Sequence, residues 1–280
     1  MITVQNLSFS YTPKQKLFSN LNLRMEKGHI YGLLGKNGAG KSTLLKNMIG
    51  LALPKSGSCK VNGTEVSTRP VSVLEDVYFL PEEIYVPSLT PGKFAASTGS
   101  FYPKFDKGQY DQYLKMLDID PTAVMDKMSF GQQKKAMIAF GLATNTSLLI
   151  MDEPTNGLDI PSKTQFRKLI ASVLTEERCI VISTHQVRDL DSLIDSLVVL
   201  HDRDIVVNCP IEDISERLTF ATYADTTGMN VLYEEDGIRG KNTILQNTEG
   251  TYSKTDLELL FNAIISGNQP IVDLLNKSAK

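Results

Sequence analysis

Apolar and polar residues alternate in two different rhythms along this chain. Over residues 1–34 the apolar side chains fall mostly at every second position, with one slip of phase near Asn6, which predicts β-strands. Elsewhere, short apolar runs predict buried strands, and spacings of three and four predict helices. The predicted buried strands are His29–Leu34, Val71–Leu80, Leu148–Met151 and Cys179–Ser183, and the predicted helices are Lys41–Ile49, Tyr110–Leu117, Gln132–Leu142 and Ser162–Leu174. Because apolar strands alternate with helices, the pattern predicts an α/β sheet covered by helices.

A turn at Asp202–Asp204 and the loss of periodicity that follows it divide the chain. Short apolar segments on both sides of this turn predict a closing hairpin. The pattern therefore predicts one domain over residues 1–207 and an accessory segment over residues 208–280, whose role the sequence leaves open. Within that segment, Thr255-Asp-Leu-Glu258 has the spacing of a capping box and predicts the start of a helix.

Residues 82–141 have a different texture, because aromatic side chains gather there. Such a group has two interpretations: a surface on which nucleic-acid bases stack, or the core of a small helical subdomain. Lysines in this span are few and scattered, which favours the helical subdomain. The aromatic residues are Phe94, Phe101, Tyr102, Phe105, Tyr110 and Tyr113.

The composition is that of an ordinary globular protein, with 41% apolar and 22% charged residues over 280 positions. A formal net charge of −3 gives no electrostatic case for nucleic acid as a partner. The cysteines are scattered, which favours reduced thiols in a cytoplasmic protein over a disulfide framework or a zinc site. They are Cys59, Cys179 and Cys209. No apolar run approaches the roughly 20 residues that cross a bilayer, and residues 1–11 do not read as a signal peptide.

A glycine-rich loop follows the predicted strand His29–Leu34 and fits the pattern G-x-x-x-x-G-K-[ST]. Glycines let main-chain N–H groups wrap phosphate oxygens, and the helix that follows offers its positive N-terminus to the anion. Lys41 would reach the β- and γ-phosphates, and Ser42 would place a hydroxyl on Mg²⁺. The alternatives are a chance glycine-rich turn, or a dinucleotide motif G-x-G-x-x-G, which fails because Thr43 occupies its last position. The predicted phosphate-binding residues are Gly35, Lys36, Asn37, Gly38, Ala39, Gly40, Lys41, Ser42 and Thr43.

Two acids follow the buried strand Leu148–Met151. Asp152, at the end of the strand, is placed to hold the magnesium shell. Glu153, the next residue, is placed to polarise a water for in-line attack on a γ-phosphate. Taken alone, two acids after a strand also fit a solvated turn, but the glycine loop upstream favours a nucleoside triphosphatase.

Further motifs lie in a fixed order around these two. Ser129-Phe-Gly-Gln132 precedes a predicted helix, Asn156-Gly-Leu-Asp159 follows Glu153, and His185 follows a buried strand. With the glycine loop, this set resembles the ATP-binding cassette family, the nucleotide-binding subunits of ABC transporters, over about residues 1–207. The resemblance implies an ATPase that uses ATP and Mg²⁺. It also implies an α/β P-loop NTPase fold with a RecA-like mixed sheet core, an N-terminal antiparallel β subdomain and an inserted α-helical subdomain at about residues 82–141.

The resemblance also implies roles for residues that contact the nucleotide. Tyr11 matches the aromatic residue that stacks on adenine, although a tyrosine at a strand end also fits. Ser129, Gly131 and Gln132 match the signature that caps the γ-phosphate of ATP bound to the opposite subunit. Phe130 replaces a glycine of that signature. Asp159 falls in a motif that lies at the nucleotide in this family.

Two further positions match residues near the metal and the γ-phosphate. Glu82 stands where the family carries a glutamine that touches Mg²⁺, and its carboxylate is a suitable ligand, although a simple loop acid is the alternative. His185 matches the switch histidine that holds the γ-phosphate and the attacking water. The implied catalytic pair is thus Glu153 and His185, and the implied metal-binding residues are Ser42, Glu82 and Asp152.

The resemblance finally implies partners. Because each ATP is completed by the signature of another subunit, we expect a homodimer or heterodimer of cassettes, docked on integral membrane subunits at the inner face of the cell membrane. The aromatic helical region resembles that of exporter subunits, and an importer is the alternative. A cassette ATPase without a transport role and a non-hydrolytic nucleotide sensor remain open, the latter because of Phe130 and Glu82.

Overall fold

Three β-sheets form the framework of the chain in a computed structural model that describes residues 1–12, 15–248 and 250–276. An antiparallel sheet consists of β2 (Gln15–Met25), β1 (Ile2–Thr12), β4 (Ser56–Val61) and β5 (Thr64–Glu65), in that order. A central sheet has the order β10 (Asp204–Pro210), β9 (Ser196–His201), β3 (Ile30–Leu34), β8 (Cys179–Thr184), β7 (Leu148–Asp152) and β6 (Val77–Leu80). Neighbouring strands of this sheet are parallel, apart from β9 and β10, which pair antiparallel to each other. The sheet is therefore mixed.

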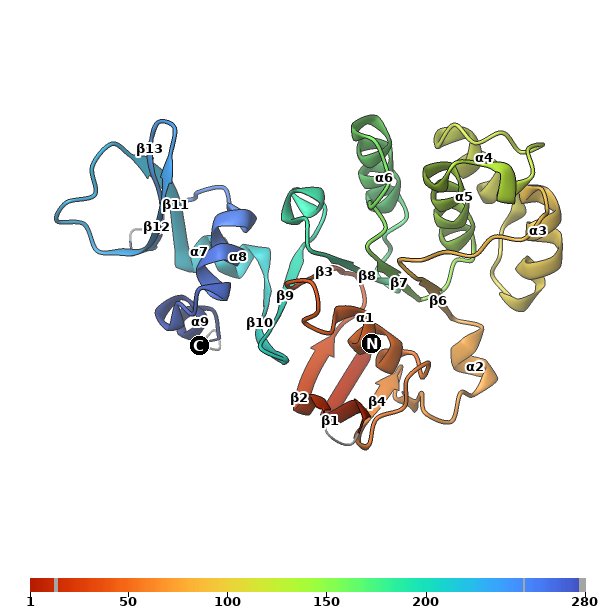
Figure 1. Cartoon of the computed structure of the whole chain (residues 1–280), viewed down its shortest axis with the longest axis horizontal. Coiled ribbons are helices and arrows are strands. Elements are labelled where there is room, and N and C mark those ends of the chain that lie inside the picture. Colours follow the sequence, from red (N-terminus) through yellow and green to blue (C-terminus); the bar gives the residue numbers. More distant parts are fainter. Residues whose placement is uncertain (13–14, 249, 277–280) are drawn as a thin grey trace.

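The central sheet has a hydrophobic core on each face. In β3, Ile30 and Leu34 belong to one core, whereas Tyr31 and Leu33 belong to the other. Figure 1 shows the antiparallel sheet and α1 (Lys41–Met48) below the central sheet, and α6 (Ile160–Ser172) and the helical region above it. Burial on both faces explains the continuous apolar runs of these strands. The predicted mixed α/β fold, with its antiparallel β subdomain and inserted helices, is confirmed.

The prediction of one strand over Val71–Leu80 is wrong in its first half. The chain forms the short helix α2 (Val71–Leu74) after Pro70 and only then enters β6. The side chains of Val71 and Leu74 are 72% and 46% exposed. This apolar run therefore forms a helix at the surface first and a buried strand after it. Periodicity alone does not separate the two cases.

The helical region is built around an aromatic cluster. Its helices are α3 (Pro91–Thr98), α4 (Lys107–Met116) and α5 (Phe130–Ala143), with short 3₁₀ turns at Gly99–Phe101 and Met125–Lys127. The ring of Phe140 is fully buried and lies 4.8 Å from the ring of Phe94 and 5.1 Å from that of Phe105. Phe101, which the sequence placed in the same group, is instead 72% exposed.

Phe140→Ala is therefore expected to lower the free energy of unfolding by about 3–5 kcal/mol, because it removes the ring at the centre of this cluster and leaves a cavity. Chemical denaturation of the two proteins measures the difference. Phe101→Ala is the matched control, since the same deletion at an exposed ring should change stability by less than about 0.5 kcal/mol. Equal losses in both variants would show that the cluster is not a core.

A third unit follows the central sheet. It contains α7 (Ile211–Arg217), the antiparallel sheet β11 (Leu218–Tyr223), β13 (Gly240–Gln246) and β12 (Val231–Gly237), and the helices α8 (Leu257–Ile265) and α9 (Gln269–Asn276). Figure 1 places it beyond β10, at the opposite end of the molecule from the helical region. The predicted boundary at residues 207 and 208 falls inside β10 and remains a prediction, and the last residues of the predicted accessory segment, 277–280, lie outside the described residues.

The helix predicted from the capping box in this unit is present as α8, but its cap is one residue later than predicted. Asp256 is the N-cap, and its Oδ1 accepts hydrogen bonds from the N–H groups of Glu258 and Leu259. The hydroxyl of Thr255 lies instead 3.0 Å from that of Ser215 on α7. Asp256 and Thr255 are neighbours, and either side chain can accept from the N–H groups of the first turn. The spacing pattern does not show which of the two is the cap.

Candidate functional site

A cavity of about 560 Å³ opens at the carboxyl ends of β3 and β8. Its wall includes Tyr11, most of the glycine-rich loop, Glu82, Glu153 and His185, so residues that are far apart in sequence meet here. Parallel strands end at the same edge of a sheet, and the loops that follow them gather at that edge. The order of β3 beside β8, and β8 beside β7, brings the glycine loop next to both acidic and imidazole side chains.

The glycine loop takes a conformation that suits glycine. Gly38 and Gly40 have φ of 80° and 108°, in the left-handed region. A Cβ atom on Gly40 would lie 2.9 Å from the ring of Phe18 of β2, so the loop is also held against the antiparallel sheet. Gly40 is the N-cap of α1 and offers no side chain to the N–H groups of the first turn. Those groups therefore remain available to an anion.

Lys41 is the first residue of α1, and its side chain is buried against the loop. Its Nζ donates a hydrogen bond to the carbonyl oxygen of Gly35 at 2.9 Å and lies 3.6 Å from Oε1 of Glu153. The lysine is 7% exposed, so its stem is fixed by the protein and its ammonium faces the cavity edge. An ammonium held in this way is suited to a phosphate group.

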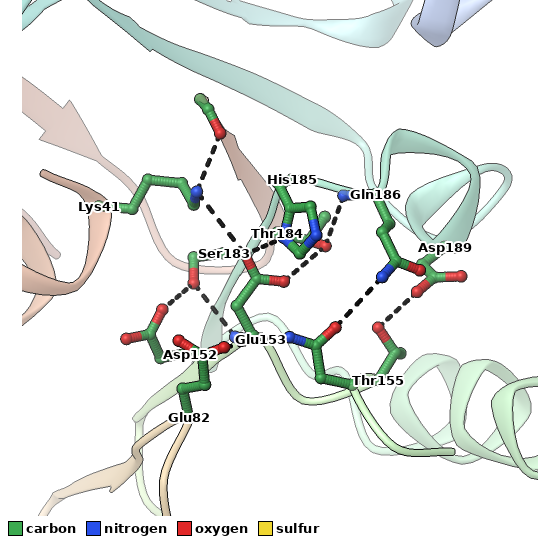
Figure 2. Close-up of polar contacts among 12 residues, drawn as sticks. Lys41, Glu82, Asp152, Glu153, Thr155, Ser183, Thr184, His185, Gln186 and Asp189 are labelled. Atoms are coloured by element: carbon green, nitrogen blue, oxygen red, sulfur yellow. Dashed lines mark hydrogen bonds and ion pairs between the residues drawn. The ribbon is translucent and has the colours of Figure 1, made fainter. Parts of the chain in front are cut away.

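Glu153 is the most constrained residue of the site (Figure 2). Its φ is 47°, and its N–H donates to the carbonyl oxygen of Ser183 at 3.0 Å. The carboxylate is held at both oxygens: Oε1 lies 2.8 Å from Nδ1 of His185, and Oε2 accepts from the hydroxyl of Thr184 at 3.0 Å. A non-glycine residue in the left-handed region costs of order 1 kcal/mol and is typical of functional positions. The end of β8 thus aims this carboxylate between Lys41 and His185.

Oxygen ligands suited to a hard cation lie beside Glu153. Asp152 is 2% exposed and accepts a hydrogen bond from the hydroxyl of Ser183. Oε1 of Glu82 accepts from the side-chain amide of Asn156 at 3.1 Å. Together with the hydroxyl of Ser42, these carboxylates are the donor types that Mg²⁺ prefers.

Tyr11 is also part of the cavity wall. Its side chain is 68% exposed, and its hydroxyl lies 2.8 Å from that of Thr43 in α1. The ring also meets that of Phe9 edge to face, with 4.9 Å between centroids. An exposed ring held by its hydroxyl and by a neighbouring ring offers surface on which a planar base can stack.

The signature residues lie outside this cavity. Ser129 caps α5 and forms a capping box with Gln132: Ser129 Oγ accepts from the N–H of Gln132, and Gln132 Oε1 accepts from the N–H of Ser129. Asp159 caps α6 through a carboxylate oxygen that accepts from the N–H of Ser162, and the hydrogen bonds from Ser162 lower the pKa of its carboxyl. Among the described residues, Ser129, Gly131, Gln132 and Asp159 do not contribute to the cavity wall around Lys41.

Among the described residues of the wall, the sequence did not predict Gln15, Lys16, Leu17 and Arg203. Arg203 lies in the β9–β10 turn, where it and Asp202 have φ of 69° and 47°, as in a type I′ hairpin. Its Nη1 donates to the carbonyl oxygen of Lys16 at 2.8 Å. The turn was predicted from sequence, but only the pairing of β9 beside β3 places this cation next to the glycine loop. None of the helices in the described part of the chain has the length and apolar character that a bilayer crossing needs.

The known proteins that this chain resembles in sequence are ATP-binding proteins of transporters. The model of the ABC transporter family matches residues 18–156. A putative ABC transporter ATP-binding protein of Bacillus cereus is 32% identical over 76% of this chain, which spans only 39% of that protein's length. The lantibiotic transport ATP-binding protein SrtF of Streptococcus pyogenes is 32% identical over 74% of this chain and 90% of its own length. The bacitracin transport ATP-binding protein BcrA of Bacillus licheniformis is 29% identical, over 72% and 68%.

Solved structures similar to this chain include further ATP-binding subunits and cassettes. An ATP-binding subunit of an ABC transporter has a TM-score of 0.69 and 25% identity, over 76% of this chain and 91% of that chain. A dimeric ATP-binding cassette in a post-hydrolysis state, bound to ADP and Pi, has a TM-score of 0.66 and 21% identity, over 75% and 98%. The second likeness shows the fold alone.

Proposed function

Because this chain belongs to the family of ATP-binding proteins of ABC transporters, we propose that it binds and hydrolyses ATP as one subunit of such a transporter. The observation that carries the proposal is the carboxylate of Glu153, buried and held between the ammonium of Lys41 and the imidazole of His185. A general base beside a phosphate-binding loop is the arrangement that in-line attack of water on a γ-phosphate needs.

The nucleotide would lie along the cavity from the glycine loop to Tyr11. The N–H groups of residues 35–43 would surround the phosphates, with Lys41 at the β- and γ-phosphates. The exposed face of Tyr11 would take the adenine. Arg203, at the wall next to Lys16, adds positive charge to the side on which a polyanion enters.

The donor set beside Glu153 fits Mg²⁺. Ser42, Asp152 and Glu82 would hold the ion, directly or through water. Bound there, the ion would neutralise charge that develops on the phosphates. The protein residues keep their own tasks: Ser183 orients Asp152, and Asn156 orients Glu82.

Catalysis would rest on Glu153 and His185. Glu153 would accept the proton of the attacking water as its oxygen bonds to the γ-phosphorus. The bond from that phosphorus to the β–γ bridging oxygen breaks at the same time, and ADP leaves. His185 contacts Glu153 through Nδ1, which leaves Nε2 on the opposite side of the ring for a phosphate oxygen. The hydroxyl of Thr184 keeps the second carboxylate oxygen in place.

A second cassette would complete each site. Ser129, Gly131, Gln132 and Asp159 stand away from the cavity, where they would meet nucleotide bound to the partner subunit. The dimeric cassette structures among the fold neighbours support this arrangement. Closure of the dimer on ATP and its opening after hydrolysis would move the helical region against integral membrane subunits at the inner face of the membrane.

The names of two relatives support a proposal about the transported substrate. One is named for bacitracin transport and the other for lantibiotic transport, both peptide antibiotics. We therefore propose that this chain energises export of a peptide of that class; an importer subunit is the second candidate.

Three measurements test this function. The purified chain should release phosphate from Mg-ATP and sediment as a dimer when hydrolysis is blocked with vanadate. A strain without this chain should become more sensitive to bacitracin or to a lantibiotic, and re-expression should restore resistance. No phosphate release would remove the ATPase function, whereas turnover with unchanged sensitivity to both peptides would remove only the proposed substrate class.

A further inference from the structure

Lys134 is an unusual residue in the middle of α5. Its side chain is 0% exposed, although lysines are almost never fully buried without a partner. Its Nζ donates a hydrogen bond to the main-chain carbonyl oxygen of Glu153 at 2.9 Å, and this is its one hydrogen-bonding partner in the described part of the chain. An apolar side chain would fill the same volume without the cost of removing an ammonium from water. The bond to Glu153 is therefore a directional contact that packing alone does not require.

This contact acts on a strained point of the main chain. Glu153 has a φ of 47°, and its N–H is held by the carbonyl oxygen of Ser183 at the end of β8. Lys134 holds the carbonyl side of the same residue from α5. Because both sides of the residue are fixed, the left-handed turn persists and its carboxylate points toward Lys41 and His185.

Phe130 covers the buried ammonium. The Nζ of Lys134 lies 5.1 Å from the centroid of the Phe130 ring, within the range of a cation–π contact. The same ring lies against Gly157, where a Cβ atom would come within 2.8 Å of Cδ1 of Phe130. Phe130 thus joins the start of α5 to the segment that follows Glu153, although its side chain remains 48% exposed.

The charge of Lys134 also faces the acidic centre of the site. Burial lowers the pKa of Lys134, and the carboxylates of Glu82, Glu153 and Asp152 oppose that shift. The ammonium therefore adds positive potential behind the residues that would hold the metal and the water.

We propose that Lys134 is a positioning residue for Glu153, and that the Phe130 ring keeps its ammonium shielded from water. The inference rests on the proposed role of Glu153 in ATP hydrolysis. It gives the phenylalanine in Ser129-Phe130-Gly131-Gln132 a function within the same chain. It also links the helix that carries the signature to the catalytic carboxylate of that chain, so movement of α5 changes the position of Glu153.

Lys134→Met tests the proposal, because methionine keeps much of the volume and removes the donor. The kcat for Mg-ATP is expected to fall at least tenfold, while KM and the Kd for nucleotide change less than threefold. Lys115→Met, at an exposed lysine of α4, is the matched control and should leave both constants unchanged. Lys134→Arg, which keeps the charge and a donor, is expected to recover part of the lost kcat.

A double variant separates positioning from general damage. In a Glu153→Gln background, Lys134→Met should change the residual turnover less than twofold, because the group it positions has been removed. A loss of equal size in both backgrounds would overturn the proposal. If Lys134→Met does not fold, Phe130→Leu in the same two backgrounds decides, with an expected twofold to fivefold loss of kcat that disappears beside Glu153→Gln. A wild-type chain without turnover would overturn the proposed function as well, whereas turnover that Lys134→Met and Phe130→Leu leave unchanged overturns only this inference.

Discussion

Glu153→Gln is expected to lower ATP turnover by about 10²–10³-fold, because a positioned general base contributes roughly that factor. Glutamine has the same length, and it can keep the contacts with His185 and Thr184 that the carboxylate makes. The main-chain contacts with Ser183 and Lys134 do not involve the side chain, so the turn should persist. What is lost is the ability to accept a proton from water.

Nucleotide binding should survive this change. The carboxylate of Glu153 faces the cavity in which a triphosphate would lie, so replacing it with a neutral amide removes a repulsive charge. We expect the Kd for ATP to stay equal or fall, and a dimer to accumulate because closure is no longer followed by hydrolysis. Phosphate-release assays and light scattering with Mg-ATP measure the two effects.

Glu83→Gln is the matched control for Glu153→Gln. Glu83 lies next to the predicted metal ligand Glu82, and its side chain is exposed. Turnover should therefore be unchanged in that variant. Equal turnover in the wild type and in Glu153→Gln would show that another group takes the proton, and the catalytic role proposed for Glu153 would be withdrawn.

The parts of the site that the sequence predicts well are those encoded by neighbouring residues. The loop from Gly35 to Ser42 depends on glycines at fixed spacing. Gly35 lies against the carbonyl oxygen of Leu200, and Gly40 against the ring of Phe18, only because neither has a Cβ. Asp152 and Glu153 follow a strand whose apolar run is itself unambiguous. The spacing of these residues therefore sets the conformation of the loop, and that conformation places the groups that would bind phosphate.

The parts that the sequence could not predict depend on contacts between distant segments. Arg203 reaches the cavity because β9 pairs beside β3. Lys134 reaches Glu153 because the start of α5 lies against the segment that follows β7. Neither pairing leaves a spacing pattern in the sequence. Burial of Lys134 was also unexpected, since a lysine on a helix is ordinarily placed on its solvated face.

The third unit shows the same limit in a different form. Its strands β11–β13 are largely half exposed, so they lack the apolar runs that marked β3, β7 and β8. Beyond Asn208 the sequence therefore indicated little except the helix α8. The sheet of this unit is defined by antiparallel pairing between its strands, for example of Phe220 in β11 with Ile244 in β13.

Lys41→Met is expected to weaken Mg-ATP binding by at least about 100-fold, or roughly 2.8 kcal/mol, and to abolish turnover. Methionine fills much of the same buried space, but it removes the one ammonium of the glycine loop that is held at the cavity edge, 2.9 Å from the carbonyl oxygen of Gly35. It also leaves the carboxylate of Glu153 without its nearest cation, so that carboxylate would repel the phosphates more strongly. Titration with a fluorescent ATP analogue, followed by phosphate release, measures both losses. Lys46→Met on the same helix is the control and should bind as the wild type does, because Lys46 is not part of the cavity wall in the described residues. A Kd within threefold of wild type for Lys41→Met would mean that the main-chain N–H groups of the loop hold the phosphates without the lysine, and the charge-based account of this site would fail.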